Sequence, residues 1–220
     1  MKWGKKYSSD YVNNVCKLIN HFLSIPHKIY CYTDDPTDIE CEIIPIDFPY
    51  NFNRRINLFQ KNFADGLCLV LDLDILILKD FKDILKKDDG ITILNSHWKE
   101  KPKYKGKIAS DGFRSTGNGS VTMWTANNPL VLEIYDHFMS DPKHYSSIYY
   151  DQDIDWGSID RFVDWEHLPY NTFPDKTAHS YFYNKKIDES YYFWIFNKGM
   201  HIEAKKYQQI WIDKLCNQKI

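Results

Sequence analysis

Several features that would assign a function directly are missing from this sequence. The net charge is only −2, so no excess of basic residues favours nucleic acid as a partner. No apolar run approaches the roughly 20 residues that a membrane helix needs, and residues 1–10 lack the apolar stretch of a signal peptide. The five cysteines form no CxxC pair, which favours free thiols in a reducing compartment over a zinc site. We therefore expect a cytoplasmic protein with no transmembrane segment and no nucleic-acid ligand.

The hydrophobic pattern predicts one α/β domain over residues 1–220. A chain of 220 residues suits a single domain, and it contains no internal repeat or linker. Segments with helical spacing alternate with short β-prone runs, a pattern typical of a mostly parallel central sheet flanked by helices. Strands are expected within residues 27–35, 41–46, 67–71, 91–95 and 120–124, and helices within residues 11–22, 53–63, 81–87, 129–140 and 203–215.

The most informative segment is LCLVLDLDILIL (Leu67–Leu78), where Asp72 and Asp74 interrupt an apolar run. Burying a carboxylate is costly unless a partner compensates its charge. Residues two apart in an extended strand point the same way, so both carboxylates project together where the apolar strand ends. Paired carboxylates at the carboxyl end of a strand suit Mg²⁺ or Mn²⁺ with a phosphate ligand. The alternative is structural, with one aspartate capping a turn and the other paired with a lysine.

This segment resembles the DxD segment of nucleotide-sugar-dependent glycosyltransferases with the GT-A fold, particularly glycogenin-like enzymes and small viral and bacterial relatives. Other segments resemble the same superfamily in the same order: KWGKKYSSDYVNNV (Lys2–Val15), CYTDDP (Cys31–Pro36), RRINLF (Arg54–Phe59), GNGSVTMW (Gly117–Trp124) and YYDQDI (Tyr149–Ile154). One departure is that only Met1–Trp3 precede Gly4, where the superfamily has a complete strand. Either that strand is very short or the chain starts at an internal methionine.

The resemblance implies a role for individual residues at the nucleotide and metal end of the site. Tyr7 would lie near the base, while Thr33 and Asp34 would hold the base or the ribose. Asp72 would face the ribose and the metal, and Asp74 would be the principal metal ligand.

It also implies roles at the sugar end. Arg55 would approach the diphosphate or the sugar, although the adjacent Arg54 competes for that role, and Asn118 would touch the donor sugar. The catalytic residues would be Asp151, Gln152 and Asp153, with Asp155 a further member of that acidic cluster. His201 would complete the metal site, or else be a structural histidine.

The implied activity is metal-dependent transfer of a sugar, with Mn²⁺ or Mg²⁺ as cofactor. The donor would be a nucleoside diphosphate sugar, with a UDP-sugar favoured, and the acceptor a hydroxyl of a glycan, glycoprotein or glycolipid. Residues 1–95 would hold the nucleotide and metal, and residues 96–220 the donor sugar and the acceptor. The compartment would be the bacterial cytoplasm, or the host cytoplasm if the protein is viral.

Two other functions compete with this interpretation. A nucleotidyltransferase that makes a sugar nucleotide uses a related fold, but it needs a glycine-rich basic loop, and KWGKKY is poor in glycine. A non-catalytic module of the same fold, which only binds a carbohydrate or nucleotide, is the third possibility. The sequence does not decide between an inverting and a retaining transfer.

Overall fold

The computed structural model describes residues 1–47, 54–100, 117–145, 159, 162–163 and 166–217. It divides into two compact units, each assembled from segments that are distant in the sequence. Unit 1 comprises Met1–Asp47, Leu71–Ile84 and Lys176–Ile220, and unit 2 comprises Phe48–Val70 and Leu85–Asp175. The predicted functional division at residue 95 stays a prediction.

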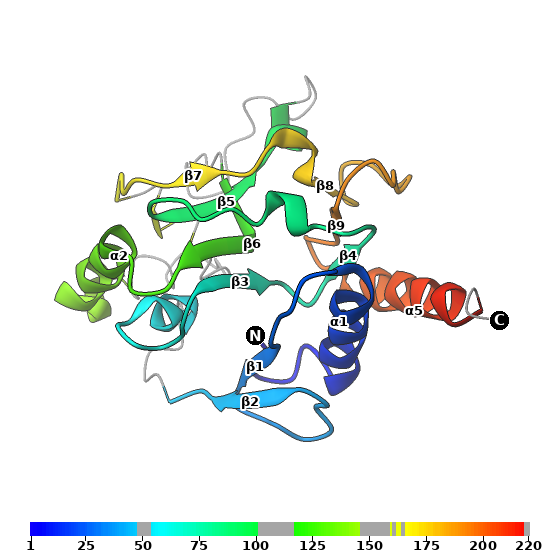
Figure 1. The fold of residues 1–220 in the computed structure, drawn as a ribbon, viewed down its shortest axis with the longest axis horizontal. Helices are drawn as coiled ribbons and strands as arrows, with labels where there is room; N and C mark the ends of the chain where they lie inside the picture. The colour runs from blue at the N-terminus through cyan, green and yellow to red at the C-terminus, as the bar shows by residue number, and fades with distance from the viewer. Residues whose placement is uncertain (48–53, 101–116, 146–158, 160–161, 164–165, 218–220) are drawn as a thin grey trace. The chain divides into compact units, whose positions relative to one another are not determined.

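Unit 1 contains two small sheets and two long helices (Figure 1). Its elements are α1 (Ser9–Phe22), β1 (Tyr30–Thr33), β2 (Glu42–Pro45), β4 (Ile75–Ile77), β8 (Ala178–Ser180), β9 (Phe193–Ile195) and α5 (His201–Asn217). β1 and β2 pair in parallel, whereas β9 lies between β4, which is antiparallel to it, and β8, which is parallel. The two helices pack against each other, and both pack against β4.

The core of unit 1 is densest around β4 and β9. All residues of both strands are fully buried, because the apolar run continues on both faces. On α1, the apolar residues Tyr11, Val12, Val15 and Leu18 recur with helical spacing and are buried, as the sequence predicted.

The N-terminal segment adds a single β-bridge to this unit. Lys2 pairs with Thr33 in parallel, and its N–H donates to the carbonyl of Tyr32 at 3.0 Å. The Lys2 ammonium is buried and contacts a carboxylate oxygen of Asp35 at 3.2 Å. Within the described residues, the segment before Gly4 therefore joins β1 through this one isolated bridge.

Unit 2 contains one four-stranded sheet in the order β3-β6-β5-β7 (Figure 1). Its elements are the 3-10 helix η1 (Arg54–Phe59), β3 (Leu67–Leu71), β5 (Ile91–Asn95), β6 (Gly117–Thr125), α2 (Pro129–Ser140) and β7 (Asn171–Thr172). β5 is antiparallel to β6 and parallel to β7, and α2 packs against η1. Unit 2 also contains the short 3-10 helix η3 (His97–Glu100), whereas η2 (Lys82–Ile84) belongs to unit 1 and η4 (Asp175–Thr177) begins at the last residue of unit 2.

The predicted α/β class is confirmed, and several predicted elements have the expected bounds. β3 and β5 begin and end where the sequence predicted. The strand pairing is mixed: the pairs β1–β2, β5–β7 and β8–β9 are parallel, whereas β4–β9 and β5–β6 are antiparallel. None of the helices in the described ranges is both long and apolar enough to cross a bilayer.

One prediction about the strand before the aspartates was wrong. The continuous apolar run Leu67–Leu71 predicts a strand buried on both faces, as in a parallel sheet, but its first four residues are only partly buried. β3 is a terminal strand of its sheet within the described residues, which leaves it less covered than a central strand. The fully buried strand is β4, which follows the aspartates. A continuous apolar run does not distinguish these two situations.

The two main N-caps of the fold differ in how they use their side chains. Asn128 precedes Pro129, and its side-chain oxygen accepts from the N–H of Leu130 at 2.9 Å, as a capping residue should. Ser8 occupies the N-cap of α1 but makes no capping bond. Its hydroxyl donates instead to a carboxylate oxygen of Asp10 at 3.2 Å.

We predict that Asn128→Ala destabilises the protein by about 1 kcal/mol, because it removes an N-cap hydrogen bond. Ser8→Ala should cost clearly less, since no capping bond is lost, and Asn128→Ser should recover most of the stability. Urea unfolding followed by circular dichroism measures all three. An equal loss in Ser8→Ala and Asn128→Ala would contradict this assignment of the caps.

Candidate active site

Asp72 and Asp74 lie at the break between two strands. β3 ends at Leu71 and β4 begins at Ile75, so both aspartates belong to the connection. Both side chains are partly buried, while Leu73 between them is buried in the core. The apolar residues on either side therefore fix where the carboxylates emerge, and the prediction that they sit where the strand ends is confirmed.

The carboxylate of Asp74 is disfavoured in its charged form, because its favourable contacts do not offset burial and the nearby Asp72. Burial, together with the nearby negative charge of Asp72, raises the pKa of Asp74 to about 7. The Tyr7 hydroxyl donates to Asp74 Oδ2 at 2.9 Å, and the ammonium of Lys6 is close enough to act in the opposite direction. Burial and the two aspartates also raise the pKa of Tyr7, which keeps its hydroxyl protonated as a donor.

An aromatic cluster surrounds this hydrogen bond within unit 1. The Tyr7 ring meets Tyr11 edge-on, with ring centroids 5.0 Å apart, and meets His201 edge-on at 5.9 Å. The Tyr11 hydroxyl donates to the carbonyl of His201 at 3.1 Å, which ties α1 to the first residue of α5. The structure thus brings Tyr7, Asp72, Asp74 and His201 into one neighbourhood.

Thr33 and Asp34, the predicted base or ribose ligands, are used in local structure. The Thr33 hydroxyl donates to the carbonyl of Asp35 at 3.0 Å and accepts from the N–H of the same residue at 3.1 Å. Both carboxylate oxygens of Asp34 accept from the N–H of Gly4, at 3.2 and 3.0 Å. Gly4 has a φ of +62°, a conformation that favours glycine. The two residues shape the loop beside the site, and a direct role in nucleotide binding stays a prediction.

Arg55 and Asn118, the predicted sugar-end residues, meet at an irregularity of β6 in unit 2. The register between β5 and β6 shifts there, so that Ile93 pairs with Thr122 but Leu94 pairs with Asn118. The carbonyl of Gly119 in the bulge accepts from the guanidinium of buried Arg55 and, at 3.0 Å, from the Thr122 hydroxyl. The Asn118 side chain accepts from the N–H of Ser120 at 3.0 Å. Arg55 is therefore a buried support of the bulge that carries Asn118.

The predicted catalytic residues Asp151, Gln152 and Asp153 lie outside the described residues, as does Asp155.

The residues around Asp74 suit a divalent cation in part. Two nearby carboxylates, of which Asp74 has its pKa raised by burial and by the charge of Asp72, are stabilised by a hard cation that prefers oxygen ligands. His201, whose ring packs edge-on against Tyr7, has a buried Nδ1 with no hydrogen-bond partner in the described part of the chain. However, no three His, Cys, Asp or Glu side chains among the described residues are grouped closely enough to hold a metal alone. A cation here would need ligands from its substrate as well, as Mg²⁺ commonly does.

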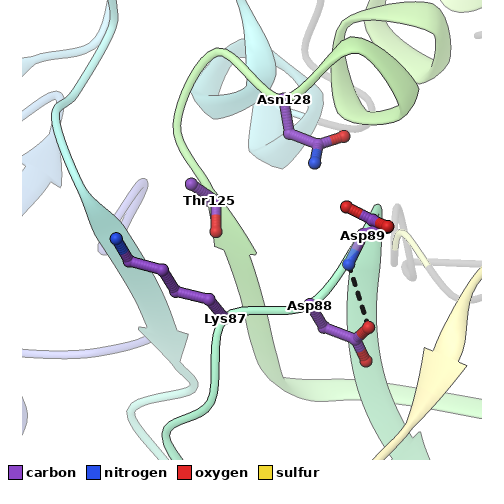
Figure 2. A pocket seen from close by; sticks show the side chains of 5 residues that line it. All are labelled: Lys87, Asp88, Asp89, Thr125 and Asn128. Atoms are coloured by element: carbon purple, nitrogen blue, oxygen red, sulfur yellow. Dashed lines mark hydrogen bonds between the residues drawn. The ribbon is translucent and has the colours of Figure 1, made fainter.

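Unit 2 also has an open hollow of about 310 Å³, away from the predicted residues in the sequence. Figure 2 shows the five side chains that line it, Lys87, Asp88, Asp89, Thr125 and Asn128. Asn128 is already used as the cap of α2, and Asp88 accepts from the N–H of Asp89 at 2.9 Å. The hollow therefore offers mainly polar groups engaged in local structure.

Comparison with solved structures identifies the fold. A glycosyltransferase involved in glycosylation of the major capsid of PBCV-1 matches with a TM-score of 0.52 and 11% identity, over 94% of this chain and 96% of that one. The galactosyltransferase LgtC, in complex with donor and acceptor sugar analogues, matches with a TM-score of 0.57 and 10% identity, over 93% and 94%. The glycosyltransferase GlyE of Streptococcus pneumoniae TIGR4 matches with a TM-score of 0.61 and 10% identity, over 99% of this chain and 63% of that one.

The chain has a GT-A-like fold. The resemblance drawn from the sequence is thereby confirmed at the level of fold, over nearly the whole chain. No family model matches the sequence, and no curated protein matches it. At about a tenth of residues identical, the likeness does not carry the activity of these proteins to this one.

We predict that Asp74→Asn stabilises the metal-free protein at neutral pH. A carboxyl whose folded pKa is raised to about 7 keeps its proton in the folded chain while the unfolded chain has lost it above about pH 4. Wild-type stability should therefore fall as the pH rises from 4 to 7, whereas Asn, which is neutral and still accepts from Tyr7, escapes that loss.

The expected gain of Asp74→Asn over wild type in EDTA is about zero near pH 4 and on the order of 1–3 kcal/mol at pH 8. Urea unfolding at a series of pH values measures it. Asp35, whose pKa is lowered to about 2, titrates below this window and is shared by both proteins. A stability difference that stays constant from pH 4 to 8 would refute the raised pKa.

Proposed function

We propose that this protein is a metal-dependent glycosyltransferase that moves a sugar from a nucleoside diphosphate sugar to an acceptor hydroxyl. The observation that carries the proposal is the Asp72/Asp74 pair, partly buried at a strand break in a GT-A-like fold, with the pKa of Asp74 raised to about 7. Maintaining two close carboxylates in an apolar setting is costly for a structure alone. A cation that binds them, together with a diphosphate, offsets that cost.

Asp72 and Asp74 would hold the cation, Mn²⁺ or Mg²⁺, together with oxygens of the diphosphate, and His201 would have to move toward them to become a further ligand. The metal would supply Lewis-acid chemistry there, by stabilising the negative charge that develops on the departing nucleoside diphosphate. The Tyr7 hydroxyl, already bonded to Asp74 Oδ2, orients that carboxylate. The aromatic rings of Tyr7 and Tyr11 beside it restrict water on that side.

The remaining predicted roles belong to the same proposal. Thr33 and Asp34 shape the loop that would receive the nucleotide, and a UDP-sugar is the favoured donor. Arg55 would act at the sugar end by supporting the bulge that presents Asn118. A carboxylate of the Asp151–Asp155 segment would accept the acceptor hydroxyl's proton in an inverting reaction.

The acceptor would be a hydroxyl of a glycan, glycoprotein or glycolipid, in keeping with the chemistry named for the similar structures. One of them acts in glycosylation of a viral capsid protein, and another is a galactosyltransferase bound to donor and acceptor sugar analogues. We place the reaction in the cytoplasm, as the composition of the chain led us to expect.

We predict that Asp74→Asn lowers Mn²⁺-dependent turnover of a sugar nucleotide by about 100-fold or more, because a lost metal ligand removes several kcal/mol of charge stabilisation. The assay is release of nucleoside diphosphate from a panel of sugar nucleotides, with and without Mn²⁺. Asp80→Asn is the matched control: Asp80 ends the same apolar segment but is bonded to Ser24 and Lys82 away from the pair.

Full metal-dependent turnover in Asp74→Asn would remove Asp74 from the metal site. Calorimetry with UDP and Mn²⁺ tests the proposal in another way. Absence of nucleotide binding by the wild type would indicate a non-catalytic module, and productive use of a nucleoside triphosphate with a sugar phosphate would indicate a nucleotidyltransferase.

A further inference from the structure

The backbone that carries Asp74 is held from two opposite edges. On one edge, the carbonyl of Asp74 accepts from the N–H of Phe196, directly after β9, at 2.9 Å. Successive carbonyls of an extended chain point to opposite edges. The carbonyls of Leu73 and Ile75 therefore face away from β9. β4 is a terminal strand of its sheet, so no strand among the described residues covers that second edge.

The side chain of Gln208, from α5, fills this second edge. Its Nε2 donates to the carbonyl of Leu73 at 2.9 Å and to the carbonyl of Ile75 at 2.7 Å. Both acceptors are carbonyl oxygens, so the amide must present its NH₂ group and not its oxygen. One side chain thus bridges the carbonyls of the two residues on either side of Asp74.

The position of Gln208 on α5 links this bridge to the rest of the site. His201, Ala204 and Gln208 are spaced i, i+3 and i+7 and so share one face of the helix. Ala204 and Gln208 are fully buried, and the small Ala204 side chain lets α5 approach β4 closely. The helix face that places His201 beside Tyr7 therefore also holds the backbone of Asp74.

Gln208 is a costly residue at this position. Its Oε1 is buried and has no hydrogen-bond partner within the described ranges. A buried polar atom left without a partner costs about 1–3 kcal/mol. The two hydrogen bonds to the chain around Asp74 account for a polar side chain in an otherwise apolar contact.

We propose that Gln208 is a positioning residue for the Asp72/Asp74 pair, which sets the direction of the carboxylates by fixing the backbone carbonyls of Leu73 and Ile75 on either side of Asp74. This inference rests on the proposed function, because the pair is taken to bind a metal with a nucleoside diphosphate. Gln208 itself touches neither. Its loss should leave the carboxylates in place but with more freedom, so that binding weakens more than folding does.

The first experiment measures the Kd of Mn²⁺ with UDP by calorimetry at a temperature where each variant is fully folded. Gln208→Met keeps the length of the side chain and removes both donors, and we expect it to weaken binding by about 10-fold, as loss of groups that orient metal ligands commonly does. Gln208→Asn keeps the amide on a shorter side chain and should weaken binding less.

Leu18→Ala is the control for lost stability. Leu18 is fully buried in α1, the other helix that packs on β4, and it has no side-chain group that could bond the Asp74 segment. Its removal should lower the melting temperature while leaving the Kd within about twofold of wild type, since only apolar packing is lost and no hydrogen bond to the Asp74 segment. A Kd in both Gln208 variants as tight as in Leu18→Ala would overturn the positioning role.

A second measurement needs no variant. In the wild type, the Gln208 carboxamide protons should shift on titration with Mg²⁺ and UDP, followed by NMR. The carboxamide of Gln209, bonded to Asp213 on the exposed side of α5, should not shift. Absence of any UDP binding by the wild type would count against the proposed function, whereas binding without a shift at Gln208 would count against this inference alone.

Discussion

The burial of the Asp74 carboxylate beside the like charge of Asp72 is the constraint to which the structure around them responds. Burial first, and then the nearby charge of Asp72, raise the pKa of Asp74 to about 7. Unit 1 meets this constraint in three ways. The Tyr7 hydroxyl bonds the side chain, Phe196 and Gln208 bond the backbone, and the fully buried strands β4 and β9 supply the apolar packing that keeps the segment in place.

Within a few residues of this segment, some side chains stabilise the fold and another, Asp74, destabilises it. Leu73 and Ile75–Ile77 contribute burial, while Asp74 between them opposes folding at neutral pH for as long as no cation is bound. Sites that cost stability in this way are common where a ligand supplies the missing interaction. The chain can keep the unfavourable pair because its neighbours on both sides are fully buried.

The sequence predicted those features of the fold and the site that are encoded by neighbouring residues, and missed those that depend on tertiary contacts. The strands Leu67–Leu71 and Ile91–Asn95, the Asn128 cap and the Asp72/Asp74 pair are encoded by adjacent residues, and the structure has them where the pattern indicated. The partial burial of β3 and the burial of Arg55 depend on which strands and helices pack against them. The spacing of apolar residues along the chain contains no information about those neighbours. Gln208 was missed for the same reason. Its one local signal is a glutamine on the helix face of Ala204, where an apolar residue would be expected.

The residues that contact each other around Asp74 are far apart in the sequence, so the α5 face that carries Gln208 reaches Asp74 only in the folded chain. Tyr7 and Asp74 are 67 residues apart, and Gln208 and Leu73 are 135 apart. Contacts between such distant residues carry a large loop-closure cost and so tend to form late in folding. The pair is encoded locally, but its environment exists only once the N-terminal and C-terminal segments of unit 1 have joined around β4. The carboxylates therefore acquire their raised pKa and their fixed direction together, as a product of tertiary structure, and α5 is as much a part of the site as the segment that bears the aspartates.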